Sequence, residues 1–190
     1  MNIAEARTAE HEKYTRCYKQ PNYRMGVKRM QDAVRILEEI PTRGSYLDVG
    51  TGRGEMLSFA MFHGFNPVRG TEMVKSLLDH PRVIWAPAHD LPFRMAEFHT
   101  VTMFDVIEHL ISGDDELACR ELVRVASNHV IVAANNMPSQ NKAGDDLHIN
   151  IRPYEEWDRL FRKWFEPHKV VWVTNKTSSS QIWRVDKGMN

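Results

Sequence analysis

The stretch YLDVGTGRGEML, residues 46–57, places three glycines at alternate positions directly after a short apolar run that contains an acid. Glycine loses more conformational entropy on folding than any other residue, so such a run is tolerated mainly where the backbone turns sharply or lies close to a ligand. In a doubly wound α/β fold, that place is the turn from the first strand into the following helix. The segment therefore predicts a ligand-binding loop at the carboxyl end of a leading strand.

Apolar periodicity on both sides of this loop predicts strands that alternate with helices. The expected strands are the apolar runs at residues 45–50, 66–73, 82–88, 100–107 and 129–136. The expected helices are residues 23–40, 55–64, 74–80, 114–126 and 152–165. Two β-rich runs, residues 169–175 and 180–186, lie close together in sequence and predict an antiparallel pair.

These elements predict a Rossmann-like, doubly wound α/β fold: a mostly parallel seven-stranded sheet with an antiparallel C-terminal hairpin and helices on both faces. At 190 residues the chain fits a single domain. Within it we expect an N-terminal helical segment or lid over residues 1–43, a cofactor-binding core over residues 44–136, and a substrate-side helix with the hairpin over residues 137–190. The first segment holds three tyrosines that form either a lid over the cofactor or a staple to the domain: Tyr14, Tyr18 and Tyr23.

The charge balance and the cysteines limit the possible partners and compartment. The 25 basic and 25 acidic residues give a net charge of zero, so no overall field directs the protein to nucleic acid or to an anionic membrane. Cys17 and Cys119 show neither metal nor redox spacing, which favours reduced thiols. The N-terminus lacks a signal-peptide core, and no stretch approaches the roughly 20 apolar residues that span a bilayer. We expect a soluble, cytoplasmic protein with no membrane partner.

The acid ahead of the glycines discriminates between two nucleotide-like ligands. A nicotinamide dinucleotide fold shows Gly-x-Gly-x-x-Gly, whereas here the glycines are Gly50, Gly52 and Gly54, with Asp48 two residues before them. A bare helix N-terminus would attract a pyrophosphate, but an acid beside it would repel one. The acid favours a cation, such as a sulfonium that carries an amino group.

With this motif the sequence resembles the class I S-adenosylmethionine-dependent methyltransferases, in particular their small-molecule, type 11-like branch, over roughly residues 46–172. That family carries an acid-x-Gly-x-Gly-x-Gly loop, matched from Asp48 through Thr51 to the last glycine. It also carries an acid at the end of the second strand, matched by Glu72, 24 positions on (72 − 48), followed by Met73. The resemblance implies S-adenosyl-L-methionine as the cofactor, bound by these residues, with the carboxylate of Glu72 accepting hydrogen bonds from the two ribose hydroxyls.

Two later segments extend the resemblance. APAHDLPF, residues 86–93, is similar to the loop that packs on the adenine, although Pro87 stands where the family usually carries an acid. The cofactor contacts implied there come from Ala88, His89 and Asp90. FDVIEHL, residues 104–110, is similar to the segment that ends the fourth strand beside the transferred methyl group, which implies that Asp105 lies at the cleft.

Methyl transfer chiefly requires that the nucleophile, the methyl carbon and the sulfur be aligned and that water be excluded. An acceptor hydroxyl or protonated amine also benefits from a general base, and histidine is the side chain poised near neutral pH. We therefore expect His109 and His148 as the catalytic residues, with Glu108 and Arg152 binding the acceptor. The competing interpretations are a purely orienting role for Glu108 and His109, and surface solvation for His148 and Arg152.

Two alternatives to a small-molecule methyltransferase stay open. Asp105, Glu108, His109 and His148 form an oxygen-and-nitrogen set able to hold a divalent cation, similar to the RNA 3′-terminal 2′-O-methyltransferases. The balanced charge and the lack of a basic tract make nucleic acid an unexpected partner, and we expect no metal. A non-catalytic S-adenosylmethionine-binding protein is the other alternative, motivated by Pro87. The favoured prediction is direct methyl displacement onto a small metabolite, a sugar or a nucleotide derivative.

Overall fold

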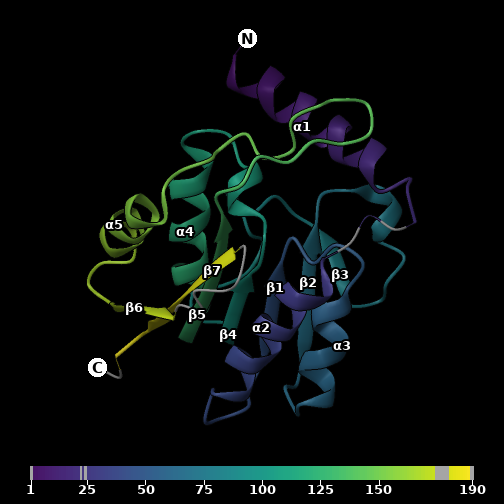
Figure 1. Cartoon of the computed structure of the whole chain (residues 1–190). Coiled ribbons are helices and arrows are strands. Elements are labelled where there is room, and N and C mark those ends of the chain that lie inside the picture. The colour runs from purple at the N-terminus through teal and green to yellow at the C-terminus, as the bar shows by residue number, and fades with distance from the viewer. Residues whose placement is uncertain (1, 22, 24, 174–179, 189–190) are drawn as a thin grey trace.

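The computed structural model describes residues 2–21, 23, 25–173 and 180–188 of the chain. Its sheet has seven strands and carries helices on both faces (Figure 1). The strands are β1 (Tyr46–Val49), β2 (Val68–Glu72), β3 (Val83–Trp85), β4 (Phe98–Met103), β5 (Ala126–Asn135), β6 (Lys169–Val173) and β7 (Ser180–Asp186). The α-helices are α1 (Ile3–Cys17), α2 (Val27–Glu38), α3 (Glu55–Phe62), α4 (Asp114–Val125) and α5 (Tyr154–Trp164).

The strand order β3-β2-β1-β4-β5-β7-β6 confirms the predicted doubly wound sheet. β1 lies between β2 and β4 and is parallel to both, and β3 and β5 continue the parallel arrangement outward. β7 runs antiparallel to β5 and to β6, which confirms the C-terminal hairpin. The direction of winding reverses between β1 and β4, so their carboxyl ends border the crevice where this class of sheet binds ligands.

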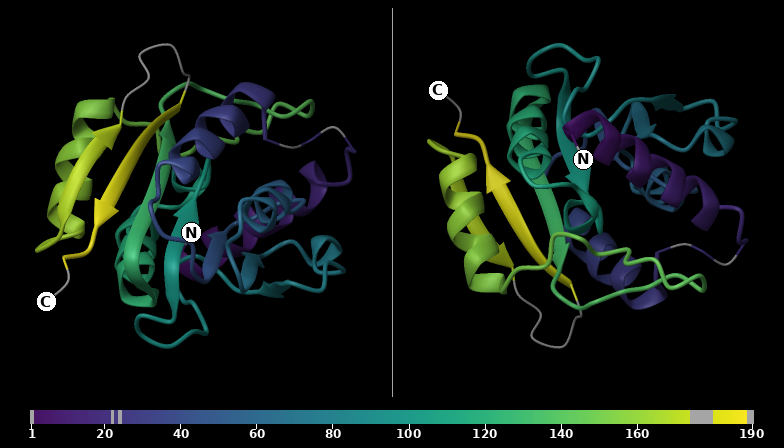
Figure 2. Two further views of the ribbon diagram at one scale, coloured as in Figure 1. Left: turned by 90° about the horizontal axis from the view of Figure 1, so that it is seen from below. Right: turned by 90° about the horizontal axis from the view of Figure 1, so that it is seen from above.

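Two apolar clusters hold the helices on the sheet. On one face, Ile36 of α2 and Leu57 of α3 are fully buried in a cluster with Tyr46 of β1. On the other face, Leu122 of α4 and Trp157 of α5 are fully buried in a second cluster. Figure 2 shows these two helix pairs on opposite sides of the sheet. The strands of such a sheet are buried on both faces, which is why they read in the sequence as continuous apolar runs.

Several boundaries differ from the sequence prediction. The helix expected from residue 23 begins at Val27, because Gly26 adopts an extended conformation (φ −67°, ψ 142°) as its N-cap. The strand expected to reach residue 107 ends at Met103, because the backbone of Asp105 is left-handed (φ 53°) and Ile107–His109 forms a 3₁₀ turn. The helix expected at residues 74–80 is also only a 3₁₀ turn, Lys75–Leu77.

Residues 174 and 175 of the predicted hairpin lie outside the described residues. Within the described part of the chain, every helix is too short or too polar to cross a membrane.

Candidate active site

The glycine-rich loop lies directly after β1 and takes the backbone through left-handed conformations. Gly50, Gly52 and Gly54 have φ values of 72°, 56° and 81°. A Cβ atom at Gly50 would lie 2.6 Å from a methyl group of Val106, and one at Gly52 would lie 2.7 Å from the Tyr18 hydroxyl. The loop therefore needs glycine both for its conformation and for the space in front of it.

Replacing Gly52 with alanine is expected to lower both stability and cofactor affinity. A left-handed φ costs an alanine about 1–2 kcal/mol, and the added methyl group collides with the Tyr18 hydroxyl. Gly113→Ala is the matched control, because Gly113 also has a positive φ (97°) but nothing within 4 Å of the added Cβ. Denaturant unfolding and calorimetry with S-adenosylmethionine should show a stability loss in both variants and an affinity loss in Gly52→Ala alone. Equal affinities would argue against a ligand at this loop.

Two carboxylates flank the loop. Asp48 is buried in β1, and its Oδ1 accepts a hydrogen bond of 2.7 Å from the Thr102 hydroxyl; burial raises the pKa of Asp48 to about 6. Glu72 ends β2, and its Oε2 accepts a 2.9 Å hydrogen bond from the Gly52 N–H. Its Oε1 accepts hydrogen bonds from the N–H groups of Met73 (2.7 Å) and Val74 (3.0 Å). Glu72 thus ties the end of β2 to the glycine-rich loop.

Two cavities adjoin at the carboxyl ends of β1, β2 and β4. The smaller, of about 150 Å³, which we call the Glu72 cavity, is lined by residues that include Glu72, Met73, Val74, Ala86 and Ala88. The larger, of about 560 Å³, which we call the Asp48 cavity, is lined by residues that include Asp48, Thr51, Gly52, Asn135 and His148. Gly50, Asp105 and His109 line both cavities. Together they form a site of mixed polar and apolar lining and of the size that binds small ligands.

Asp105 lies where the two cavities meet. Its Oδ1 accepts a hydrogen bond of 2.8 Å from the Ser180 hydroxyl of β7, and its Oδ2 lies 3.2 Å from Nε of Arg29 on α2. Burial raises the pKa of Asp105, whereas the charge of Arg29 opposes that rise. The carboxylate of Asp105 is therefore held by α2 and β7, two elements that are far from it in sequence.

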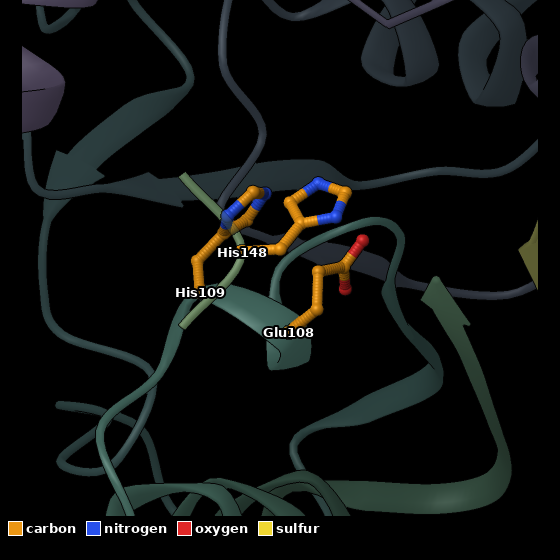
Figure 3. Close-up of side chains that lie close together, drawn as sticks. All are labelled: Glu108, His109 and His148. Atoms are coloured by element: carbon orange, nitrogen blue, oxygen red, sulfur yellow. The ribbon is translucent and has the colours of Figure 1, made fainter. Parts of the chain in front are cut away.

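The side chains of Glu108, His109 and His148 lie close together, with one ligand atom from each within 4.8 Å of the others (Figure 3). His148 Nδ1 lies 2.5 Å from the Met137 carbonyl, and His109 Nδ1 lies 2.9 Å from the Leu147 carbonyl. A carbonyl only accepts hydrogen bonds, so we assign the proton to Nδ1 in both rings, which leaves Nε2 with its lone pair. Burial lowers the pKa of His148, and lowers that of His109 to about 3. Both rings are therefore neutral bases or ligands near pH 7.

Glu108 is fully buried beside these rings and lines neither cavity. Neither of its carboxyl oxygens has a hydrogen-bond partner within the described residues, and burial raises its pKa well above the usual range, an effect that the charge of Asp105 increases. Its main-chain carbonyl accepts hydrogen bonds of 3.0 Å from Ile149 and Asn150. Glu108 thus fixes the His148 segment through its backbone, while its side chain faces His148 (Figure 3).

Besides Glu108, four of the expected site residues lie outside both cavities: Gly54, His89, Asp90 and Arg152. His89 points to Asp114, with Nδ1 and Oδ2 3.5 Å apart, and the exposed Asp90 donates its N–H to the Pro87 carbonyl in a turn. Arg152 donates a hydrogen bond of 2.7 Å to the buried Asp115 and stacks on a tryptophan ring. Each has a structural partner away from the cavities, so the contacts expected of His89, Asp90 and Arg152 stay predictions without support from the cavity linings. Gly54 also lies off the cavity walls and acts as the N-cap of α3.

Polar residues at or beside the site that the sequence interpretation missed include Arg29, Thr102, Asn135 and Ser180. Asn135 lies near the carboxyl end of a predicted strand, where ligands bind, and that position was a usable signal. Thr102 lies near the start of the predicted strand 100–107, so only the observed bounds of β4 place it near a carboxyl end. Arg29 and Ser180 come from distant parts of the chain. Local sequence patterns do not show which distant residues come into contact in the fold.

The comparisons with known proteins agree with the fold. Residues 47–134 match the family model described as "Methyltransferase domain". A search of curated proteins found no significant match.

Several solved structures are similar over most of the chain. One is a Burkholderia thailandensis 1,6-didemethyltoxoflavin-N1-methyltransferase with bound 1,6-didemethyltoxoflavin and S-adenosylhomocysteine, at 15% identity, covering 98% of this chain and 91% of that one (TM-score 0.77). A possible histamine N-methyltransferase from Thermotoga maritima shares 20% identity over 82% and 87% of the two chains (TM-score 0.61). The methyltransferase domain of the bacterial CtHen1-C shares 17% identity over 85% and 97% (TM-score 0.66).

The sheet order, with a glycine-rich loop at the end of its first strand, is that of the class I S-adenosylmethionine-dependent methyltransferases. Residues 47–134 match the methyltransferase-domain family, and the fold over most of the chain is that of solved S-adenosylmethionine-dependent methyltransferases.

Proposed function

We propose that this enzyme methylates a small metabolite, a sugar or a nucleotide derivative by direct displacement. The observation that carries the proposal is the pair of adjoining cavities, of about 150 and 560 Å³, that meet at Asp105. A pocket of several hundred Å³ is typical for a small ligand. The larger cavity therefore leaves room for an acceptor beyond the methionine end of the cofactor.

We propose that the adenosine end of the cofactor occupies the Glu72 cavity. Three backbone N–H groups occupy three of the roughly four lone-pair sites of the Glu72 carboxylate, which leaves a site on Oε2 for a ribose hydroxyl. Met73 and the backbone of Ala88 lie on the same wall. The methionine end would then lie in the Asp48 cavity, where Asp48, Gly50, Thr51 and Gly52 line the wall and the carboxylate attracts the amino group.

The acceptor side is proposed around Asp105 and His148. The cofactor supplies a methyl group already activated by its sulfonium, so this chain must position the acceptor and remove its proton. The lone pair on His148 Nε2 accepts the proton of the acceptor O–H or N–H as the new bond to the methyl carbon forms and the carbon–sulfur bond breaks. The negative charge of Asp105 stabilises the protonated ring of His148. His109 lies beside this pair as a second neutral imidazole, with ring centroids 4.8 Å apart.

We also propose the division of the chain into three parts that the sequence predicts. Residues 137–150 carry His148 and border the larger cavity through Met137, Pro138 and Ser139, which supports an acceptor role for the segment after residue 136. Residues 44–136 contain the glycine-rich loop and both flanking carboxylates. Within the N-terminal part, α1 is the element we propose as a lid, because α2 packs on the sheet.

Activity toward small acceptors is tested by incubating the protein with S-adenosylmethionine and panels of hydroxyl- and amine-bearing metabolites, sugars and nucleotides. The expected result is release of S-adenosylhomocysteine together with a mass gain of one methylene group (about 14 Da) in a single acceptor class. Binding of the cofactor without turnover on any panel would favour the non-catalytic alternative.

A second candidate function, metal-assisted methylation of an RNA 3′-terminal ribose, is favoured by one observation, the cluster Glu108–His109–His148. One imidazole nitrogen from each of His109 and His148 and an unpartnered buried carboxylate form a donor set that suits a divalent transition ion. The ion would supply Lewis-acid positioning of two ribose hydroxyls.

Manganese binding distinguishes this candidate from the first. If the cluster holds an ion, calorimetry should show one Mn²⁺ site that is lost in Glu108→Gln, and methylation of an RNA oligonucleotide should require Mn²⁺ and stop on addition of a chelator. Small-acceptor activity that is indifferent to Mn²⁺ and chelator would eliminate the metal-assisted candidate.

A further inference from the structure

Helix α1 attaches to the protein through polar contacts. Arg7 donates two hydrogen bonds to the Asp114 carboxylate, of 2.8 and 2.5 Å, and Lys13 Nζ donates one of 2.6 Å to the Asp146 carbonyl. Of its 15 residues only Lys13 and Cys17 are buried. Because α1 buries so little apolar surface, its docking is stabilised weakly and depends on what fills the space beneath it.

That space is the Glu72 cavity. Glu10, His11 and Tyr14 of α1 line it opposite Glu72, Met73 and Ala88. Figure 1 shows α1 at one end of the sheet, beside the green segment that contains residues 137–150. A ligand in this cavity therefore touches α1 as well as the strand ends, and its binding favours the docked helix.

Tyr14 also reaches the acceptor side. Its hydroxyl donates a hydrogen bond of 2.8 Å to the Leu147 carbonyl and lies 2.5 Å from His109 Nδ1, and the two rings meet edge-on with centroids 5.0 Å apart. Leu147 directly precedes His148, whose ring packs on that of His109. Burial raises the pKa of Tyr14, so its hydroxyl stays a donor at physiological pH. One side chain of α1 thus touches the cofactor cavity, one catalytic candidate, and the residue next to the other.

We propose that Tyr14 is a positioning residue that couples cofactor binding to the placement of His148. When α1 closes over the cofactor, the Tyr14 hydroxyl holds the Leu147 carbonyl and His109 Nδ1 together, and this fixes the segment that presents His148 to the acceptor. The consequence is ordered binding, in which the cofactor enters first and completes the acceptor site. The proposal rests on the proposed function, since it requires the adenosine end of the cofactor in the Glu72 cavity.

The test is hydrogen exchange with and without S-adenosylhomocysteine, which needs no knowledge of the acceptor. The Leu147 N–H donates to the Ser139 carbonyl (2.7 Å) and the Ile149 N–H to the Glu108 carbonyl (3.0 Å), so peptides over residues 137–150 report on this segment. In the wild type, the ligand should slow exchange at least threefold in both α1 and residues 137–150. In Tyr14→Phe, the slowing in α1 should remain and the slowing in residues 137–150 should fall by more than half.

Arg7→Gln is the matched variant on the same helix. It removes the bond to Asp114 but leaves Tyr14 in place, so the ligand should still slow exchange in residues 137–150. Two results would overturn the coupling while leaving the proposed function intact: bound ligand that does not change exchange in residues 137–150 of the wild type, or an equal change in Tyr14→Phe. Failure of S-adenosylhomocysteine to bind the wild type in calorimetry would instead remove the proposed function, and the coupling with it.

Discussion

Asp48→Asn should weaken the binding of S-adenosylmethionine about 10- to 100-fold while making the ligand-free protein more stable. The affinity loss follows from removing a charged partner of the cofactor's amino group, since a charge-assisted hydrogen bond is worth roughly 1.5–3 kcal/mol. Asparagine has nearly the same shape and keeps a carbonyl oxygen for the Thr102 hydroxyl, so the loop should keep its conformation. Calorimetric titration of both proteins with the cofactor measures the difference.

The gain in stability follows from the pKa of Asp48. Burial raises that pKa from 3.8 to about 6 in the folded protein, so the folded state binds the proton more tightly than the unfolded state. The free energy of unfolding gained from the tightly held proton is present in full below about pH 4 and is lost as the pH rises through 6. At pH 7, where Asp48 is ionised, this loss amounts to about 3 kcal/mol. The uncharged asparagine avoids this cost. We expect the free energy of unfolding at pH 7 to rise by about 1–3 kcal/mol, measured by denaturant titration.

The protonation of Asp48 also makes cofactor binding depend on pH. Cofactor affinity of the wild type should fall as the pH drops below about 6, because the carboxylate takes up a proton, whereas Asp48→Asn should show no such fall. Asp79→Asn is the control, because Asp79 is exposed and lines neither cavity. Equal affinities for wild type and Asp48→Asn at pH 7 would contradict the role given to Asp48.

His148→Gln should reduce the rate of methyl transfer by about 10²- to 10⁴-fold, the usual contribution of a general base. The cofactor affinity should change by less than about twofold, because His148 lies outside the Glu72 cavity and is proposed to face the acceptor rather than the methionine end of the cofactor. Glutamine retains an N–H that can donate to the Met137 carbonyl but cannot take up the acceptor proton. Single-turnover rates with the acceptor found in the panels, combined with calorimetry, separate the two effects.

The control for this variant is His168→Gln, since His168 precedes β6 and lies outside both cavities. It should leave the rate and the cofactor affinity unchanged. A normal rate in His148→Gln would return His148 to a structural role on the wall of the larger cavity.

The glycine-rich loop and its flanking carboxylates were predictable because their signals are local, whereas His89 and Asp90, also expected at the cofactor, lie outside both cavities. The left-handed turns of the glycine-rich loop require glycine in the sequence, and Asp48 and Glu72 follow from the position of each acid on or after a predicted strand. The alternation of apolar runs with helical patterns is also a local signal, and it predicted the sheet. Strand pairing in such a fold follows from topology rules that need only the order of the elements.

The acceptor half was less predictable because its geometry depends on contacts between distant residues. Arg152 was expected at the acceptor on the basis of its charge, but Asp115, 37 residues earlier, holds it elsewhere. Tyr14 and His109 are 95 residues apart in sequence and yet in contact. Asp105 was expected at the cleft, but its left-handed backbone, which sets the direction of the carboxylate, has no signature in the residue type.

A crystal structure with bound S-adenosylhomocysteine tests the central claim most directly. The account predicts the adenosine end between Ala88 and α1, a ribose hydroxyl on Oε2 of Glu72, and the amino group beside Asp48, with the sulfur pointing toward Asp105 and His148. A ligand bound in the reverse direction, or one that leaves the Glu72 cavity empty, would contradict it.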